Sequence, residues 1–216
     1  MRVALVLLTG YGCGGGEPAT PDAACTPSTL FLNRAGGAYD TGPFDDALAN
    51  HSVLLDGPMQ LPPYPHDNAT WTSTTACIRR GLAQFPIDIV EEAPSIPHVE
   101  LVFTTTYWAG SPGMTYVVPD SCLPHQLGFV FGEALPTDAR ACQMALVGYA
   151  QLTAGLSIGD NCNDFLDLSM DCAPERAFVD AEVDCVDALD QPTMCRCGGT
   201  TQNTFAALTA AHPSCE

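Results

Sequence analysis

The stretch VGYAQLTAGLSIGDNC, residues 147–162, holds the most specific candidate for catalytic chemistry in the sequence. Gly155, Ser157 and Gly159 match the G-x-S-x-G pattern, in which a strained turn exposes a nucleophilic serine hydroxyl. That turn needs a strand before it and a helix after it, but here a helical pattern precedes and the acidic run GDNCNDF follows. Ser157, an aspartate and His212 satisfy the chain order of a triad, yet aspartates are abundant in this region. A serine hydrolase is therefore kept only as an alternative.

The segment before this serine is expected to form a long helix over residues 139–156. Thr137 is a suitable N-cap, and Asp138 suits the positive end of the helix dipole. Apolar residues recur on more than one face of the segment, which predicts a helix buried on more than one side. Gly155 or Gly159 is expected to end it.

The remaining periodicity predicts a single α/β or α+β domain with a mixed sheet. Residues 34–72 are rich in Gly, Pro and Asp and are expected to be long loops. Pro86 ends an amphipathic helix, and a weaker helix is expected near the C-terminus, in an irregular disulfide-rich tail. Strands are expected at 28–33, 87–90, 99–105, 116–118 and 127–131, and the two helices at 74–85 and 202–211.

Several stretches resemble bacterial secreted zinc metallopeptidases of the metzincin (matrixin-like) type. STLFLNRAGG is similar to the opening strand of that family, and CIRRGLAQFPIDIVEEAP to its first helix and the next strand. GFVFGEA resembles the strand before the active-site helix, and CRCGGTTQNTFAALTA the tail of some members. The resemblance covers roughly residues 28–213 and implies one zincin-like domain over residues 28–216.

The family's zinc motif, H-E-x-x-H-x-x-G-x-x-H, has lost its chemistry in this chain. In the family three imidazoles hold zinc and the glutamate is the general base. When the motif is aligned on Gly155, Gly148 takes the place of the first ligand and Tyr149 that of the base. Leu152 and Ile158 take the places of the second and third ligands. No ligand position offers nitrogen, sulfur or carboxylate, and a phenol with a pKa near ~10 is a poor base. The resemblance thus implies a metallopeptidase homologue without catalytic residues, metal or cofactor. The alternative is a core helix of an unrelated domain.

Other candidate ligands give no metal site. The family's Met-turn is expected at Leu166 or Met170. No two of the five histidines have ligand spacing, and Cys195-Arg196-Cys197 is not a C-x-x-C pair. Residues 160–190 hold ten carboxylates but lack EF-hand spacing, so we interpret them as a solvated acidic surface. The aromatic pair Tyr107-Trp108 is either a binding surface or packed.

The cysteines and the N-terminus predict an exported protein. Residues 1–12 resemble a lipoprotein signal peptide, which makes Cys13 the lipidation site and residues 13–27 a flexible tether. The alternative is ordinary secretion with cleavage near Gly16. Either way ten cysteines remain, an even number suited to disulfides in an oxidising compartment: Cys25, Cys77, Cys122, Cys142, Cys162, Cys172, Cys185, Cys195, Cys197 and Cys215.

The charge of the chain limits its partners. The net charge is −18 and the sequence contains no lysine. Such a surface repels nucleic acid and anionic headgroups, so we expect no nucleic-acid partner and membrane contact only through the N-terminal lipid. The sequence favours a non-catalytic protein of the bacterial envelope (an outer-membrane lipoprotein) or a secreted one, which binds a peptide, a protein or an envelope component. A structural disulfide-rich envelope protein unrelated to proteases is the alternative.

Overall fold

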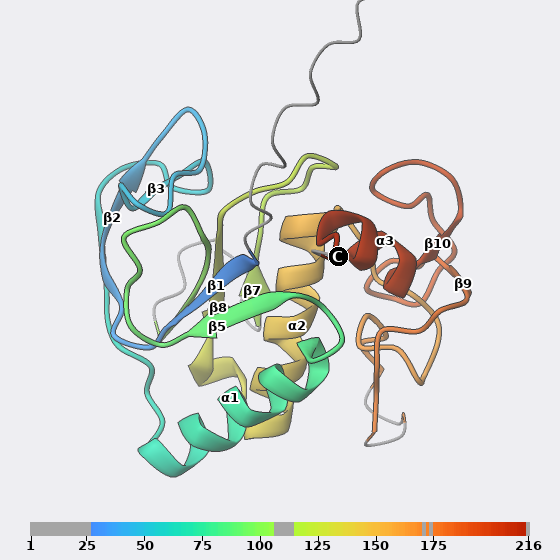
Figure 1. The fold of residues 1–216 in the computed structure, drawn as a ribbon, viewed down its shortest axis with the longest axis horizontal. Coiled ribbons are helices and arrows are strands. Elements are labelled where there is room, and N and C mark those ends of the chain that lie inside the picture. Colours follow the sequence, from blue (N-terminus) through green and yellow to red (C-terminus); the bar gives the residue numbers. More distant parts are fainter. Residues whose placement is uncertain (1–26, 106–114, 170–171, 173–174, 215–216) are drawn as a thin grey trace, which may run out of the picture.

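A five-stranded mixed sheet forms the centre of the molecule (Figure 1). The structure is a computed structural model that describes residues 27–105, 115–169, 172 and 175–214. Strands β5, β1, β6 and β8 are parallel, and β7 pairs antiparallel with β8 at one edge. In sheet order the strands are β5 (Ile87–Val90), β1 (Ser28–Asn33), β6 (Val99–Thr104), β8 (Leu127–Phe131) and β7 (Tyr116–Val117). The sequence predicted all five.

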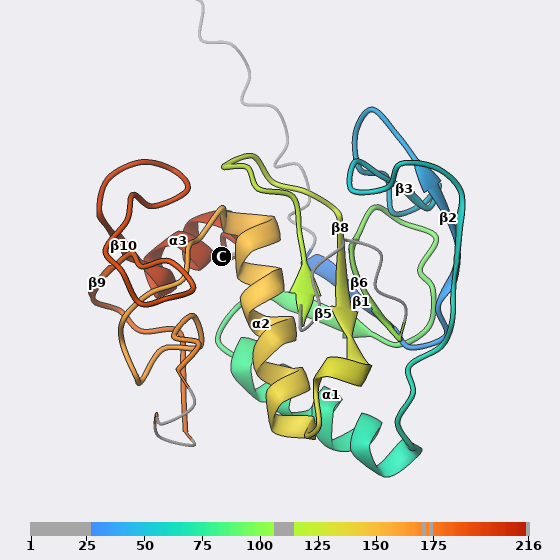
Figure 2. The ribbon, with the colours of Figure 1, turned by 180° about the vertical axis from the view of Figure 1, so that it is seen from behind.

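Two helices cover one face of this sheet (Figures 1 and 2). They are α1 (Asn68–Leu82) and α2 (Asp138–Ala154). Strand residues that alternate toward this face, such as Leu32 and Leu101, join Ile78 of α1 and Leu146 of α2 in one buried core. The disulfide Cys77–Cys142 links the two helices covalently. The predicted long buried helix is therefore α2, and its bounds agree with the prediction to within two residues.

The opposite face of the sheet is covered by the segment that follows β1, where the prediction of long loops missed a small sheet and the start of a helix. This segment contains a small three-stranded sheet, β3-β2-β4, with bounds His51–Ser52, Gly37–Thr41 and Met59–Leu61. It also contains the start of α1, which begins six residues earlier than predicted. Asp67 caps that helix by accepting a hydrogen bond from the Thr70 amide. The first turns carry mostly small polar residues, so they show little apolar periodicity.

The C-terminal region lies on the side of α2 away from the main sheet (Figures 1 and 2). After α2 the chain forms a two-stranded sheet of β9 (Glu182–Asp184) and β10 (Thr201–Asn203), followed by α3 (Thr204–Ala211). The remainder of the C-terminal region is irregular. Outside this region, a short 3-10 helix, η1 (Gly132–Ala134), precedes α2. The fold is thus α+β, with a mixed sheet, a long buried helix and an irregular disulfide-rich tail.

Disulfide bonds confirm the predicted use of eight of the ten cysteines. Besides Cys77–Cys142, the structure has the pairs Cys122–Cys197, Cys162–Cys172 and Cys185–Cys195. Cys25 and Cys215 lie outside the described residues, as do the proposed signal peptide, Cys13, Tyr107, Trp108 and Met170. None of the described helices is long and apolar enough to cross a bilayer.

Candidate functional site

Helix α2 ends where the zinc-motif alignment placed its glycine. Thr137 begins the helix by accepting a hydrogen bond from the Arg140 amide, and Gly155 ends it in the left-handed conformation, with φ 61° and ψ 25°. A side chain at Gly155 would be strained there and would also meet Cys197 Sγ, 2.6 Å from the ideal Cβ position. The chain therefore turns after residue 155, and Ile158 does not continue the helix.

The first and second ligand positions, Gly148 and Leu152, face the same part of the sheet. An ideal Cβ on Gly148 would lie 3.6 Å from the Tyr116 ring and 3.7 Å from Val118 Cγ1. The Leu152 side chain lies against Gly128, 2.8 Å from that residue's ideal Cβ position, and Val118 Cγ1 lies 3.0 Å from the same position. Gly148 thus faces β7 and β6, Leu152 faces β8, and hydrocarbon fills the space around both positions.

The base position, Tyr149, points elsewhere. Its side chain is 1% exposed, and its hydroxyl lies 3.1 Å from Nε2 of His212 at the end of α3. The two rings are stacked with 13° between their planes. His212 Nδ1 in turn lies 2.9 Å from the Ser28 hydroxyl. Burial raises the pKa of the Tyr149 phenol far above its usual range and lowers the pKa of His212. The pair is neutral and links α2, α3 and β1.

A guanidinium lies close to the first ligand position. Arg196 Nη2 lies 3.4 Å from Gln151 Oε1, one turn along α2 from Gly148. Its Nε forms an ion pair with Asp120 at 3.0 Å, and its buried Nη1 has no hydrogen-bond partner among the described residues. Burial raises the pKa of the nearby Tyr116 phenol. These neutral and cationic groups disfavour a metal cation beside Gly148.

Ser157 has no histidine partner among the described residues. It follows a helix, not a strand, and its hydroxyl accepts a hydrogen bond from the Arg196 amide at 2.6 Å. Its own amide and carbonyl bond to the Gln202 side chain. Since both ring nitrogens of His212 face Tyr149 and Ser28, the Ser157–His212 pairing is wrong. This removes the triad suggested by the G-x-S-x-G pattern.

A different serine, histidine and aspartate do come together. His125 Nε2 lies 3.0 Å from the Ser121 hydroxyl, and its Nδ1 lies 2.8 Å from Asp45 Oδ2. The buried Asp45 carboxylate also accepts hydrogen bonds from the Ser52 hydroxyl and the Val53 amide. These are the contacts of a nucleophile, a base and the group that orients the base. No sequence pattern could reveal them, because Asp45 is eighty residues from His125.

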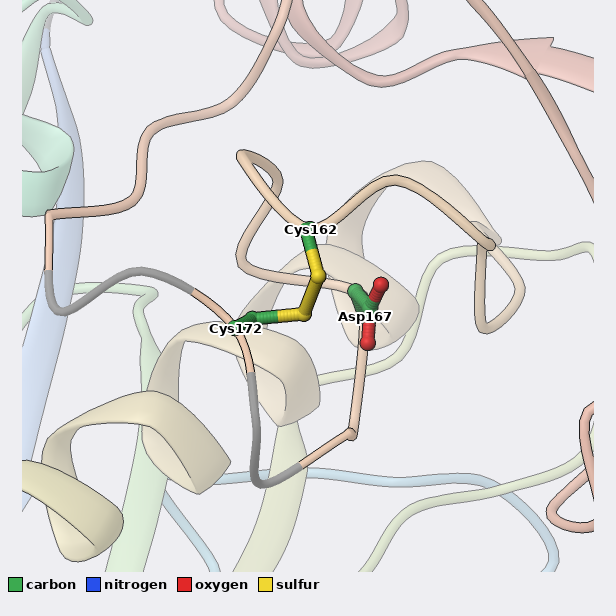
Figure 3. A group of neighbouring side chains, drawn as sticks. All are labelled: Cys162, Asp167 and Cys172. Carbon is green, nitrogen blue, oxygen red and sulfur yellow. A yellow bond between two sulfur atoms is a disulfide. The ribbon is translucent and has the colours of Figure 1, made fainter.

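One group of three potential metal ligands occurs among the described residues: Cys162, Asp167 and Cys172 (Figure 3). The two sulfur atoms form a disulfide bond, so neither is a thiolate that could bind a metal. The Asp167 carboxylate caps a local turn by accepting a hydrogen bond from the Ser169 amide. This group therefore stabilises the irregular tail and is not a metal centre.

Comparison of the chain with family models, curated proteins and solved structures finds no match. What the chain can do must therefore be argued from its own residues.

Proposed function

We propose that this chain is a non-catalytic protein with a metzincin-like scaffold, and that its role is to bind a peptide, a protein or an envelope component. The observation that carries the proposal is the geometry of α2. It follows β8 as the motif helix should, it ends at Gly155, and apolar contacts occupy Gly148 and Leu152. The base position, Tyr149, serves a structural hydrogen bond. The same scaffold without its reactive groups is suited to binding.

Metal analysis and a peptidase assay test this proposal together. The purified chain should contain no stoichiometric zinc and should cleave no peptide, with or without added zinc. One tightly bound zinc per chain, removed by a chelator together with an activity, would overturn the proposal.

Four disulfide bonds are compatible with an extracellular or envelope location, because the cytosol keeps thiols reduced. We place the protein more narrowly, as a lipoprotein anchored through Cys13. The intact mass of membrane-extracted protein should then show an acylated N-terminal cysteine. A soluble mature form that begins after Cys13 would contradict the anchor and leave the scaffold proposal intact.

A secreted hydrolase is the second candidate function, and the Ser121–His125–Asp45 arrangement favours it. The amide of Cys122, directly after Ser121, donates no hydrogen bond within the described part of the chain. An amide in that position contributes to the oxyanion hole of nucleophile-elbow hydrolases. Reaction of Ser121 with a fluorophosphonate probe decides between the two candidates.

A further inference from the structure

Glu100 is a carboxyl group inside the central sheet. It is the second residue of β6, where it lies between Phe31 of β1 and Leu127 of β8 in the strand register, and it is 2% exposed. Its neighbour Leu101 belongs to the core under the helices, so the Glu100 side chain points to the opposite face. Burial of a carboxyl at such a position costs stability unless partners compensate for the lost water.

The partners of Glu100 satisfy only one of its oxygens. Oε1 accepts hydrogen bonds from the Tyr39 hydroxyl at 2.7 Å and from Asn33 Nδ2 at 2.9 Å. Oε2 accepts no hydrogen bond from the described residues, and it is not fully shielded from solvent. No arginine or histidine in the described ranges forms an ion pair with this carboxyl. Desolvation raises the pKa of Glu100, so the fold bears a cost at this residue that its own contacts leave uncompensated.

The carboxyl lines a pocket of about 450 Å³ between β1, β6 and the segment after β1. Asn33, Tyr39 and His98 supply the other polar groups around Glu100. Apolar side chains, including Phe31 and the half-exposed Leu48, form much of the remaining wall. A volume of this size holds a small organic molecule, and a few convergent polar groups on apolar walls are typical of ligand sites.

Among the acidic residues that line the pocket, Glu91 and Glu100, only Glu100 has no ion pair among the described residues. Both hydrogen-bond partners of Glu100 donate to Oε1, which leaves Oε2 free to accept a hydrogen bond from a cation when the carboxyl is ionised. At the mouth, Glu91 is paired with Arg79 at 3.2 Å. Arg34 also lines the pocket, but its guanidinium lies over the Trp71 ring, 5.3 Å from the centroid.

His98 also lines the pocket. Its Nδ1 lies 2.7 Å from the Ile96 carbonyl, which assigns the proton to Nδ1 and leaves Nε2 as an acceptor in the neutral ring. An ammonium group has three N–H donors and no acceptor. The free Glu100 oxygen is the complementary group.

We propose that this pocket binds a small aliphatic primary amine, with its ammonium group on Glu100 Oε2 and its hydrocarbon chain against the apolar wall. The inference rests on the proposed binding function and names its ligand class. A charge-assisted hydrogen bond in a partly desolvated pocket would supply most of the selectivity. An alcohol of the same length cannot form the ion pair, and a carboxylate of the same length would be repelled.

Calorimetric titration of the purified full chain with n-butylammonium chloride, sodium n-butyrate and n-butanol tests this inference. We expect saturable binding of n-butylammonium alone. Glu100→Gln keeps an acceptor for Tyr39 and Asn33 but removes the charge, and it should weaken amine binding at least about tenfold. Glu92→Gln, an exposed site outside the pocket lining, removes the same charge and should leave binding unchanged.

A second variant protects the test against a folding defect at the buried site. Ala93 is exposed and lines the pocket, so Ala93→Leu should crowd it and weaken amine binding without loss of folded structure. Equal binding of n-butyrate or n-butanol, or unchanged affinity in Glu100→Gln and Ala93→Leu, would overturn the inference. None of these outcomes alters the zinc and peptidase measurements, so failure of the amine site is distinguishable from failure of the scaffold proposal.

Discussion

The Tyr149 hydroxyl lies 3.1 Å from Nε2 of His212, and the two rings are stacked. This contact connects the middle of α2 to the end of α3 in a buried environment. The residue that the zinc-motif alignment assigned to the base position is therefore used for packing. The hydrogen bond gives the C-terminal region a specific attachment to the core, in addition to its disulfides.

Tyr149→Phe should destabilise the protein, because it removes this bond and leaves a buried imidazole nitrogen without a partner. The expected loss in the free energy of unfolding is about 1–3 kcal/mol. Chemical denaturation followed by circular dichroism measures it. Tyr64→Phe is the matched control: the buried Tyr64 hydroxyl has no hydrogen-bond partner among the described residues, so its removal should cost much less. Equal losses in the two variants would contradict a structural role for the Tyr149–His212 bond.

Glu100→Gln should raise the free energy of unfolding at neutral pH. Burial raises the pKa of Glu100, so its protonated form is favoured in the folded state. The stability from that form is complete below the unfolded-state pKa near 4.5 and is lost as pH rises through the folded-state value. The free energy of unfolding of the variant should thus exceed that of the native chain by about 1–3 kcal/mol at pH 7.5, and by less at pH 4.5.

Urea denaturation of both proteins at the two pH values measures this difference in the free energy of unfolding. The other carboxyl groups are the same in both proteins, so their contributions to the pH dependence cancel. The exposed Glu92→Gln variant controls for net charge. A difference that stays constant with pH would contradict the assignment of an uncompensated buried carboxyl to Glu100.

The sequence predicted the elements of the main sheet because their residues follow simple periodicities. The alternation in VELVFT and the apolar run LGFVF are sufficient to place β6 and β8. Gly155 was recognisable as a helix end, because only glycine readily adopts the left-handed conformation found there. The small sheet β3-β2-β4 was missed, because its strands have two to five residues and its turns carry Gly, Pro and Asp.

The polar clusters could not have been predicted from spacing. Glu100 is a polar residue in an alternating strand pattern, and such a residue normally faces solvent. It is buried because the segment after β1 folds back over that face and brings Tyr39 to it. Asp45 reaches His125 through the same segment. Both arrangements depend on tertiary contacts of a region whose own periodicity is weak.

Peptide mapping should find a Cys25–Cys215 disulfide. The eight described cysteines pair among themselves, so a complete set of bridges among the ten predicted cysteines leaves only these two. Digestion of the exported protein without reduction, after alkylation of free thiols, should yield the linked peptides. Alkylation of both cysteines would show that the bridge is missing, and it would leave the other four unaffected.

A fluorophosphonate probe tests the Ser121–His125–Asp45 arrangement as a hydrolase site. The hydrolase candidate predicts a covalent adduct on Ser121, because His125 accepts the hydroxyl proton while Oγ attacks phosphorus and fluoride leaves. Intact mass and peptide mapping locate the adduct. Ser121→Ala and His125→Gln should abolish the adduct. Ser157→Ala should leave it unchanged, because the native Ser157 hydroxyl accepts a hydrogen bond from the Arg196 amide and has no histidine partner among the described residues. The absence of an adduct on a folded protein removes the hydrolase candidate.

Restoring the three ligand positions tests the metzincin-like geometry of α2. The Tyr116 ring occupies the space beside Gly148, so the changes Gly148→His, Leu152→His and Ile158→His are best made together with Tyr116→Ala. Residues 148 and 152 share a helix face. Because the helix ends at Gly155, residue 158 does not continue along the helix axis.

If residue 158 returns to that face as the motif requires, the three imidazoles converge and zinc binds about tenfold or more tightly than in a control with only the first two histidines. If residue 158 lies away from that face, the third histidine adds nothing. Competition with a fluorescent zinc chelator measures both affinities. Equal affinity in the two folded variants would mean that α2 is a core helix unrelated to zinc peptidases, while the amine pocket at Glu100 would be unaffected.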